Sequence, residues 1–494
     1  MSDTEPEIGR RMARASAWMI LQRLAWRITG LATTIIMARI LVPEDFGLVA
    51  IATTVFGVID ALSQFGFDRA LIRNQNAGRE HYDTAWTLSI LRSMIAGIVL
   101  WLGSGFAADF FGDERLADIV KVLAVIAFIR GFQNIGVVNF QKQLWFGQDL
   151  KFRLYARAGF FVTVVSLGLL WRDYWALVAG ICAEYVLLVA LSYVMHDYTP
   201  RLSLKAWREI LGFSKWILAN NVITFLNTRL DYFVVSKFAG AETLGFYSVA
   251  NQLSTMASSA ITAPATHSMF PGFAKVADER SRLADLYLKS VSILTMIAMP
   301  AAVGIACLAE PVVMVLFGQQ WLQSVPLVQV LALYGIVRVT FGNATSVMLA
   351  VGRPDLPAAL AAARLAVLLP LLIWATSVAG AYGAAWAVFI SAVFRMLLNF
   401  IFIRRLLALR WIEIFTALWR TLTASIAMAL VLWAAADMWT LPPTTAGQAI
   451  QLAGSILLGG AVFILIQAAL WCLSGFPHSA ERILLATLRQ RLRL

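Results

Sequence analysis

Charged residues are scarce in this sequence. Only 14% of the 494 residues are Asp, Glu, Lys or Arg, and 60% are hydrophobic. A soluble domain carries about 25% charged residues, and no polar stretch here is long enough to form one. The composition excludes a soluble enzyme and a receptor with a single anchor. It predicts an all-α polytopic membrane protein, because apolar stretches of about 20 residues are the length of a membrane-spanning helix.

Residues that bind metals or form disulfides are also rare. The 3 cysteines stand singly inside apolar stretches, and the 4 histidines are far apart without metal-ligand spacing. The signatures GxxxxGK[ST], GxSxG, HExxH and DxD are absent. We therefore expect no metal, no cofactor, no built-in ATPase and no catalytic residues, so the chain is predicted not to be an enzyme. The cysteines are Cys182, Cys307 and Cys472.

What the sequence has instead is a succession of apolar stretches from end to end. They predict about fourteen transmembrane helices. A cleavable signal peptide is not expected, because Arg23 and Arg27 interrupt the first apolar run. The predicted spans are residues 16–38, 46–67, 84–106, 119–140, 155–171, 174–195, 213–238, 244–270, 286–308, 325–350, 357–378, 381–403, 415–436 and 449–473.

The basic residues of the loops predict the orientation. Nearly all of them fall on the same side as the N-terminus, whereas the opposite loops carry only Arg39, Arg115, Arg172 and Lys237. Cytoplasmic loops are rich in Lys and Arg, so both termini are predicted to be cytoplasmic. The same rule explains the net charge of +12 without nucleic-acid binding.

An internal repeat relates the two halves at an offset of 198 residues. Because six predicted spans separate the copies, both halves enter the membrane in the same direction, as in transporters built from parallel repeats. Chance similarity between helices of like composition is the alternative. The matched residues are Ser16 with Ser214, Trp18 with Trp216, Arg39 with Lys237, Glu44 with Glu242, Gly47 with Gly245 and Ala52 with Ala250; a weaker echo pairs Arg130 and Asn134 with Arg338 and Asn343.

The repeat predicts how the chain is divided. Two six-helix lobes are expected around a central axis, and two further helices stand outside the repeat. The predicted parts are an N-terminal lobe at 1–195, a cytoplasmic linker at 196–212, a C-terminal lobe at 213–403, helices 13 and 14 at 404–473, and a basic cytoplasmic tail at 474–494.

Cations outnumber acids inside the predicted spans. A charge placed there costs roughly 2.5–3.5 kcal/mol on insertion, so it normally faces protein or water. Surplus arginine suits an anionic cargo, because the guanidinium fork matches phosphate oxygens. Structural pairing is the alternative, as is snorkelling, which we expect for Arg395 and Arg420. The predicted substrate-binding residues are Arg23, Arg27, Arg130, Asn220, Asn221, Asn227, Arg229 and Arg338.

Two acids in the spans are candidates for ion coupling. Glu184 lies in the sixth predicted span and Asp231 in the seventh. A protonatable carboxylate inside a membrane can relay a coupling ion. The alternatives are that Glu184 pairs with an arginine of a neighbouring helix and that Asp231 balances Arg229 locally.

Several segments resemble one family of transporters, the polysaccharide-specific lipid-linked oligosaccharide flippases of the multidrug/oligosaccharidyl-lipid/polysaccharide exporter superfamily. The resemblance covers most of residues 10–410, and its segments occur in the expected order. They are Ala38-Arg-Ile-Leu-Val-Pro-Glu-Asp-Phe-Gly-Leu-Val-Ala50, Asn134-Ile-Gly-Val-Val-Asn-Phe-Gln-Lys142, Phe213-Ser-Lys-Trp216, Arg229-Leu-Asp231, Leu244-Gly-Phe-Tyr247 and Met269-Phe-Pro-Gly-Phe273.

This resemblance implies a flippase of the bacterial inner membrane. By alternating access it would carry a polyprenyl-pyrophosphate-linked oligosaccharide from the cytoplasmic to the periplasmic leaflet, for exopolysaccharide, lipopolysaccharide or capsule. A polysaccharide polymerase and export machinery would be its protein partners. The alternatives are a cation-coupled multidrug exporter or a lipid II flippase of the same superfamily, and, from another class, a membrane polysaccharide polymerase or ligase.

Overall fold

All regular secondary structure in the described residues is helical. The structure is a computed structural model that describes residues 5–340, 342–436, 445–475 and 481–482, without the side chains of 5–17, 20, 211–217, 219–220, 257–268 and 445–446. Its elements are α1 (Glu5–Ala38), α2 (Pro43–Ser63), α3 (Phe67–Arg73), α4 (Arg79–Phe111), α5 (Arg115–Arg130), η1 (Ile135–Val137), α6 (Val138–Lys142), α7 (Phe146–Trp171), α8 (Trp175–Val194), α9 (Trp207–Lys275), α10 (Arg280–Cys307), α11 (Ala309–Leu316), η2 (Gln319–Ser324), α12 (Val325–Thr340), α13 (Ala344–Ala350), α14 (Asp355–Leu407), α15 (Trp411–Ala436) and α16 (Thr445–Leu473).

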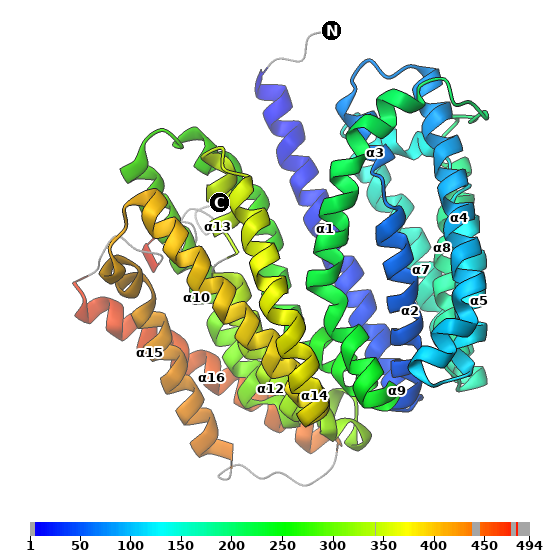
Figure 1. The fold of residues 1–494 in the computed structure, drawn as a ribbon. Coiled ribbons are helices and arrows are strands. Elements are labelled where there is room, and N and C mark those ends of the chain that lie inside the picture. The colour runs from blue at the N-terminus through cyan, green and yellow to red at the C-terminus, as the bar shows by residue number, and fades with distance from the viewer. Residues whose placement is uncertain (1–4, 341, 437–444, 476–480, 483–494) are drawn as a thin grey trace. The chain divides into compact units, whose positions relative to one another are not determined.

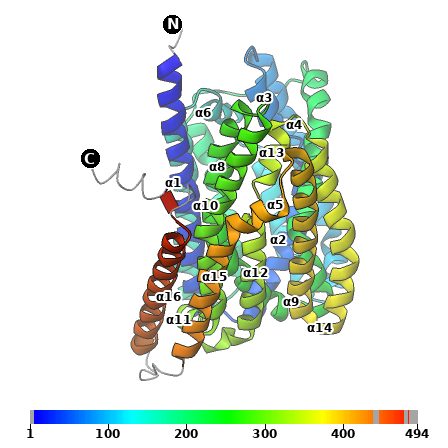
Figure 2. The ribbon, with the colours of Figure 1, turned by 90° about the vertical axis from the view of Figure 1, so that its left-hand side faces the viewer.

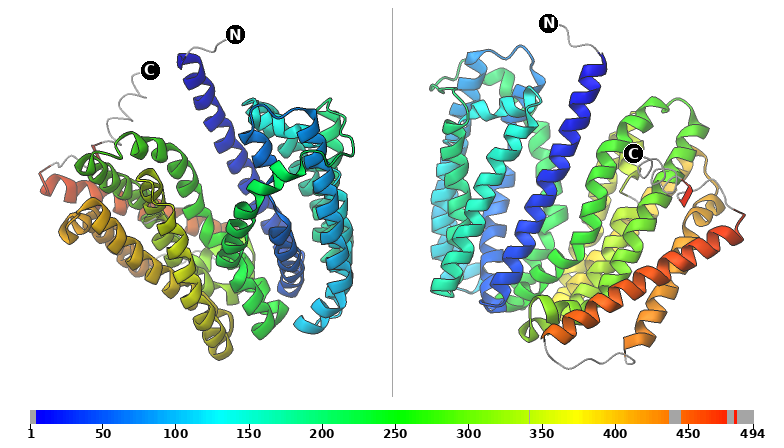
Figure 3. Two further views of the ribbon diagram at one scale, coloured as in Figure 1. Left: turned by 45° about the horizontal axis from the view of Figure 1, so that its top comes forward. Right: turned by 180° about the vertical axis from the view of Figure 1, so that it is seen from behind.

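The chain divides into two compact units, Met1–Ser248 and Val249–Leu494. In the first unit, α1 packs on α7, α2 packs on α4 and α5, and α8 packs on α5 and α7 (Figures 1 and 3). In the second unit, α10 packs on α12 and α15, and α16 packs on α15 (Figure 2). The lobe and linker boundaries expected from the repeat stay a prediction.

The prediction of an all-α polytopic membrane protein is confirmed. Among the described residues, 9 helical stretches are long and apolar enough to cross a bilayer. One of them is the 53-residue α14, which at 1.5 Å per residue is about 80 Å long and can cross a hydrocarbon core of about 30 Å twice. The number fourteen stays a prediction.

The two longest helices bend where the sequence separates two predicted spans. In α9 the break falls at Gly240, whose φ of +81° is a conformation that L side chains rarely adopt. In α14 it falls at Ala379 and Gly380. The breaks thus match the predicted gaps at 239–243 and 379–380.

The predicted span at 119–140 is wrong in its second half. Helix α5 ends at Arg130, and the chain turns before η1 and α6 begin. The reason is Asn134, whose side chain accepts a hydrogen bond from the backbone N–H of Gly136 at 2.9 Å instead of leaving the backbone helical. The second unit has a break at the corresponding place, since α12 ends at Thr340 and α13 begins directly after Asn343, although the side chain of Asn343 makes no capping hydrogen bond in the described residues. The weak echo between these two segments is therefore a repeated helix break.

Within the first unit, α2 and the second stretch of α9 cross with almost no space between their backbones. A Cβ added to Gly47 would lie 1.6 Å from the carbonyl oxygen of Ala241, and one added to Gly245 would lie 1.9 Å from that of Pro43. Ala241 follows Pro43, and Gly245 follows Gly47, by the repeat offset of 198. The two contacts are thus reciprocal, as expected where equivalent segments of a repeat meet. We call this contact the glycine crossing.

An ion-pair cluster lies beside the glycine crossing. Arg115, at the start of α5, donates to the carboxylates of Asp113 and Glu44, the latter in the first turn of α2. Hydrogen bonds from Arg115 lower the pKa of Asp113, and both carboxylates raise the pKa of Arg115. The cluster fastens α5 to the first turn of α2, next to Gly47.

Candidate functional site

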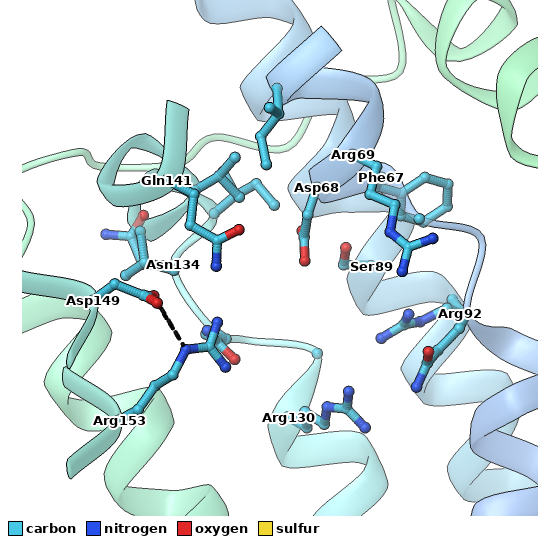
Figure 4. Close-up of a pocket in the computed structure, with 18 of the residues that line it drawn as sticks. Phe67, Asp68, Arg69, Ser89, Arg92, Arg130, Asn134, Gln141, Asp149 and Arg153 are labelled. Carbon is cyan, nitrogen blue, oxygen red and sulfur yellow. Dashed lines mark hydrogen bonds and ion pairs between the residues drawn. The ribbon is translucent and has the colours of Figure 1, made fainter. Parts of the chain in front are cut away.

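A polar cavity of about 270 Å³ lies at one end of the first unit, where α2 and α5 end and α7 begins. The loop charges predict that this end is cytoplasmic. Figure 4 shows the side chains of Arg69, Arg92 and Arg130 pointing into the space between α3, α4 and α5. We call it the four-arginine cavity. Its charged lining residues are Arg69, Arg92, Arg130 and Arg153, with Asp68 and Asp149.

Helix α3 forms one wall of the cavity. Gly66, with φ of +69°, lets the chain turn from α2 into this helix. Phe67 and Leu71, one turn apart, are buried in an apolar cluster. Asp68 and Arg69 stay exposed at the rim. The amphipathic pattern of α3 thus places charge at the mouth of the cavity.

Asn134 positions the end of α5. Its Nδ2 donates to the carbonyl oxygen of Tyr198 at 2.5 Å, and its backbone N–H donates to Oγ of Ser192 at 2.9 Å. This buried asparagine joins the turn after α5 to the segment after α8. Because α5 stops there, Arg130 in its last turn faces the cavity.

Two of the four arginines are paired with carboxylates. Nη1 of Arg130 lies 2.7 Å from Oδ1 of Asp60, and Nε of Arg153 lies 3.1 Å from Oδ1 of Asp149. The guanidinium of Arg130 also sits 5.5 Å from the ring centre of Tyr185. These contacts hold both side chains in place with part of their donors still directed at the cavity.

The other two arginines are not paired. Within the described residues, neither Arg69 nor Arg92 has a carboxylate oxygen within 4.0 Å. Nη2 of Arg92 makes only a long hydrogen bond of 3.4 Å to Ser93, and its Nε is buried without a hydrogen-bond partner in that part of the chain. A buried donor gains by finding an acceptor, so this nitrogen is available to donate to an anion bound in the cavity.

The structure brings two of the predicted substrate-binding residues to this cavity. Arg130 and Asn221 both line it, and Nδ2 of Asn221 donates to the carbonyl oxygen of Gln64 at 3.1 Å. The side chain of Asn220 lies outside the described residues. Nδ2 of Asn227 donates within α9 to the carbonyl oxygen of Ile223 at 3.0 Å.

The other predicted cations lie elsewhere. Arg23 and Arg27 are on α1, and neither lines the four-arginine cavity. Arg229 is exposed on α9, with its guanidinium 4.9 Å from the ring centre of Tyr232. Arg338 is exposed in the last turn of α12, in the second unit. Their roles in binding stay predictions.

The two candidate coupling acids are each held by a partner. Oε2 of Glu184 lies 3.0 Å from Nη1 of Arg157, and both side chains are nearly buried. Oδ2 of Asp231 accepts a hydrogen bond from the hydroxyl of Tyr247 at 2.8 Å, within α9. For Glu184 the geometry is that of the structural alternative, an ion pair with an arginine of a neighbouring helix. The local balance of Asp231 with Arg229, and a coupling role for either acid, stay predictions.

The snorkelling expected for Arg420 is wrong. Its side chain is buried, and Nε lies 3.5 Å from Oε1 of Glu481. Gln467 of α16 donates to the same carboxylate oxygen at 2.9 Å. Arg420 therefore joins α15 to α16 through Glu481, an acid that follows the last predicted span.

Sequence reasoning missed Arg69, Arg92 and Arg153 as one site. In the sequence, Arg69 and Arg153 are two of the loop charges that predict the topology, and Arg92 is one of several cations in the predicted spans. Arg69 and Arg153 share a position at the predicted cytoplasmic ends of helices, which could have joined these two residues. Arg92 lies 13 residues into α4 after Arg79, and no such signal joins it to them.

Comparison with known proteins gives both a family and a fold. Residues 36–326 match the family described as "Polysaccharide biosynthesis protein". The lipopolysaccharide biosynthesis protein WzxC of Escherichia coli K12 is 25% identical over 423 residues, which are 82% of this chain and 84% of that protein. The teichuronic acid biosynthesis protein TuaB of Bacillus subtilis 168 is 28% identical over 311 residues, 61% of this chain and 63% of that protein.

Solved structures share the fold at low sequence identity. The lipid II flippase MurJ in its inward closed conformation has a TM-score of 0.74 at 14% identity, and the match covers 92% of this chain and 99% of that one. An inward-facing multidrug resistance MATE transporter of the MOP superfamily has a TM-score of 0.63 at 17% identity, covering 78% and 94%. The chain thus has the fold of these membrane transporters, and because the family match spans more than half of its length, it belongs to the polysaccharide biosynthesis protein family.

Proposed function

We propose that this chain is a flippase of the bacterial inner membrane. It moves a polyprenyl-pyrophosphate-linked oligosaccharide from the cytoplasmic to the periplasmic leaflet by alternating access. The observation that carries the proposal is an arginine-lined polar cavity inside the helical bundle of a polysaccharide biosynthesis family member.

The charge of the interior suits a diphosphate. A guanidinium binds phosphate oxygens with two parallel hydrogen bonds and stays charged in surroundings of low polarity. Two long helices carry cations: α1 has Arg23 and Arg27, and α9 has Arg229. Placing a charge inside the membrane costs free energy, so charges there are commonly functional. In the proposal these arginines bind the pyrophosphate as it crosses, together with Arg130 and Arg338.

Polar amides supply the contacts for sugar. Helix α9 carries three asparagines, Asn220, Asn221 and Asn227. Their side-chain amides can donate hydrogen bonds to sugar hydroxyl groups and accept hydrogen bonds from them. The polyprenyl tail stays in the lipid, because apolar chains gain nothing by entering a polar cavity. Both chain termini are cytoplasmic in this proposal, and a polysaccharide polymerase receives the unit on the far side.

A cation-coupled multidrug exporter is the nearest alternative, since MATE transporters share the fold. A site for cationic drugs would have a surplus of carboxylates, whereas here arginines outnumber carboxylates in the lining. A lipid II flippase, the function named for MurJ, would handle the same diphosphate chemistry with a different sugar. The family match favours a polysaccharide precursor over lipid II.

Coupling to an ion would require one of the observed pairs to open. Protonation of Glu184 would release Arg157, and protonation of Asp231 would weaken its hydrogen bond from Tyr247. In the proposal either event accompanies the change between inward and outward states.

The test is polymer export by single variants in a strain that lacks the chain. Arg23→Ala, Arg27→Ala and Arg229→Ala are each expected to lower export at least tenfold, because one charge-assisted contact to phosphate contributes about 1.5–3 kcal/mol. Arg208→Ala, which removes an exposed arginine in the first turn of α9, is the matched control and exports normally. Normal export by all three variants, at equal amounts in the membrane, would contradict the proposed role of these cations.

A further inference from the structure

The four-arginine cavity has the shape and the lining of an anion-binding site. We propose that it binds a diphosphate group, and that the pyrophosphate of the lipid-linked cargo docks there before it crosses the membrane. The inference rests on the proposed function for the identity of the cargo, and on the geometry of the first unit for the site itself.

Among the described residues, cations outnumber carboxylates in the four-arginine cavity. Its lining holds 4 arginines and 2 aspartates, and Asp60, behind Arg130, adds one more carboxylate. A diphosphate bridged between a lipid and a sugar carries two negative charges. Each guanidinium has five N–H donors, and the carboxylates accept from only some of them. The phosphate oxygens of the diphosphate would accept from the others.

Arg92 gives the most specific indication. It lies 13 residues into α4 after Arg79, about 20 Å along the helix. Its Nε is buried without a partner in the described part of the chain, and its guanidinium faces the same space as that of Arg130 (Figure 4). The guanidinium groups of Arg92 and Arg130 repel each other, and the carboxylates of Asp60 and Asp68 offset part of that repulsion. An anion bound there would satisfy the Nε donor and screen the repulsion.

The arginines form a path from the rim to the interior. Arg69, on the exposed face of α3, and Arg153, in the second turn of α7, lie nearer the helix ends than Arg92. An anion arriving from the predicted cytoplasmic side therefore meets the exposed Arg69 first and the half-buried Arg92 last. Such a row of cations raises the rate at which anions are captured.

The size of the cavity limits what it can hold. Its volume of about 270 Å³ lies just below the range of about 300–1,000 Å³ typical of sites that enclose drug-sized ligands. A diphosphate with the first atoms of its substituents fits this volume, whereas an oligosaccharide does not. The cavity is thus a site for the group common to all such cargoes, and most of the oligosaccharide is recognised outside it.

The test begins with inorganic pyrophosphate and the purified full-length chain. Affinity is measured from the rise in apparent melting temperature with ligand concentration, with orthophosphate and sulfate at equal ionic strength as comparisons. The variants are Arg92→Gln, Arg69→Gln and the charge-retaining Arg92→Lys. The matched control is Arg208→Gln, which removes an exposed positive charge that does not line the cavity.

We expect wild-type protein to bind pyrophosphate at least tenfold more tightly than sulfate. Arg92→Gln and Arg69→Gln each weaken pyrophosphate binding at least tenfold, Arg92→Lys weakens it less, and Arg208→Gln changes it less than twofold. Equal binding by wild type and Arg92→Gln, with both folded by gel filtration, would overturn the site. So would an equal loss in Arg208→Gln, because binding would then follow net charge alone.

A second measurement separates the sources of the diphosphate. Native mass spectrometry records retention of a synthetic polyprenyl diphosphate and of phosphatidylglycerol, each with and without excess free pyrophosphate. Retention of the polyprenyl diphosphate that needs Arg92 and is displaced by pyrophosphate supports cargo docking. Retention of phosphatidylglycerol with the same dependence, or binding of free pyrophosphate but of neither lipid, overturns it.

Failure of the site and failure of the proposed function give different results. If Arg92→Gln binds pyrophosphate normally while a strain lacking the chain still traps the lipid-linked unit inside, the site is wrong and the flippase stands. If the cavity binds diphosphate but the unit reaches the outer leaflet without this chain, the diphosphate site stands and the flippase proposal is wrong.

Discussion

The glycine crossing makes a sharp prediction about substitution by alanine. In Gly47→Ala the new Cβ would lie 1.6 Å from the carbonyl oxygen of Ala241. A carbon–oxygen contact needs about 3.3 Å, so the two backbones must separate by about 1.7 Å. In Gly245→Ala the clash with Pro43 at 1.9 Å requires a separation of about 1.4 Å on the same basis.

The expected effect is a loss of stability from each variant. Forcing extra atoms into a well-packed contact costs about 1–3 kcal/mol. At about 2 °C per kcal/mol, the lower value for larger domains, the apparent melting temperature falls by about 2–6 °C. The assay is the monomer peak in gel filtration after heating of the detergent-purified protein. Gly105→Ala is the control, because it is exposed on α4 with nothing within 4 Å of its Cβ; it leaves stability unchanged or raises it by up to about 1 kcal/mol.

The double variant tests whether the two glycines share one contact. Once Gly47→Ala has moved the helices apart by about 1.7 Å, room for the second Cβ already exists, so the combined loss should be well below the sum of the two. Additive losses, or a Gly47→Ala variant that melts like wild type, would refute the reciprocal crossing.

Three further predictions concern polar contacts of the first unit. Asp83→Ala removes the acceptor of the Tyr198 hydroxyl at 2.7 Å, so trypsin should cleave the segment after α8 several times faster, and an unchanged rate would contradict this anchoring. Burial lowers the pKa of His196, whose Nδ1 accepts from the backbone N–H of Tyr198 at 3.0 Å. The folded state then binds fewer protons than the unfolded one, so the stabilisation is complete above about pH 6.5 and declines as the pH falls through the lowered pKa. The melting temperature should fall between pH 7 and 5 by more in wild type than in a His196→Gln variant; equal falls would exclude this histidine. Glu184→Ala leaves Arg157 without its carboxylate at 3.0 Å in a nearly buried position and should destabilise by about 3 kcal/mol. Glu184→Gln, which keeps a hydrogen-bond acceptor, should still export, and loss of export at an unchanged melting temperature would instead assign ion coupling to this acid.

The helical architecture could be predicted because lipid imposes a simple rule on sequence. The apolar stretches predicted α2, α4 and α8. The gaps between stretches predicted the bends near Gly240 and Gly380. The repeat offset, visible in Gly47 and Gly245, anticipated that these positions are equivalent, although not that they touch.

The helix break after Arg130 could not be predicted from local sequence. Residues 131–140 are apolar enough to continue a span. The local hydrogen bond of Asn134 with Gly136 interrupts the helix, and the contact that holds Asn134 in that position is with Tyr198, 64 residues later. Hydropathy is averaged over neighbouring residues of one segment, so it contains no information about a hydrogen-bond partner that is distant in the sequence.

The four-arginine cavity could not be predicted from the sequence for the same reason. Arg69, Arg92 and Arg153 lie on three helices, and only packing brings them to one space. Which arginines are neutralised by carboxylates also depends on tertiary contacts, such as that of Asp60 with Arg130. Sequence alone could give the excess of cations, and with it the prediction of an anionic cargo, but not the position of the binding site.

The most direct test of the flippase proposal is the sidedness of lipid-linked oligosaccharide in cells that lack this chain. The lipid is extracted after treatment of intact spheroplasts with a membrane-impermeant glycosidase. The proposal predicts that completed polyprenyl-linked oligosaccharide accumulates and is protected from the enzyme, and that the wild-type chain restores its exposure. Accumulation of the same lipid already exposed on the outer side would show that translocation does not need this chain and would contradict the proposal.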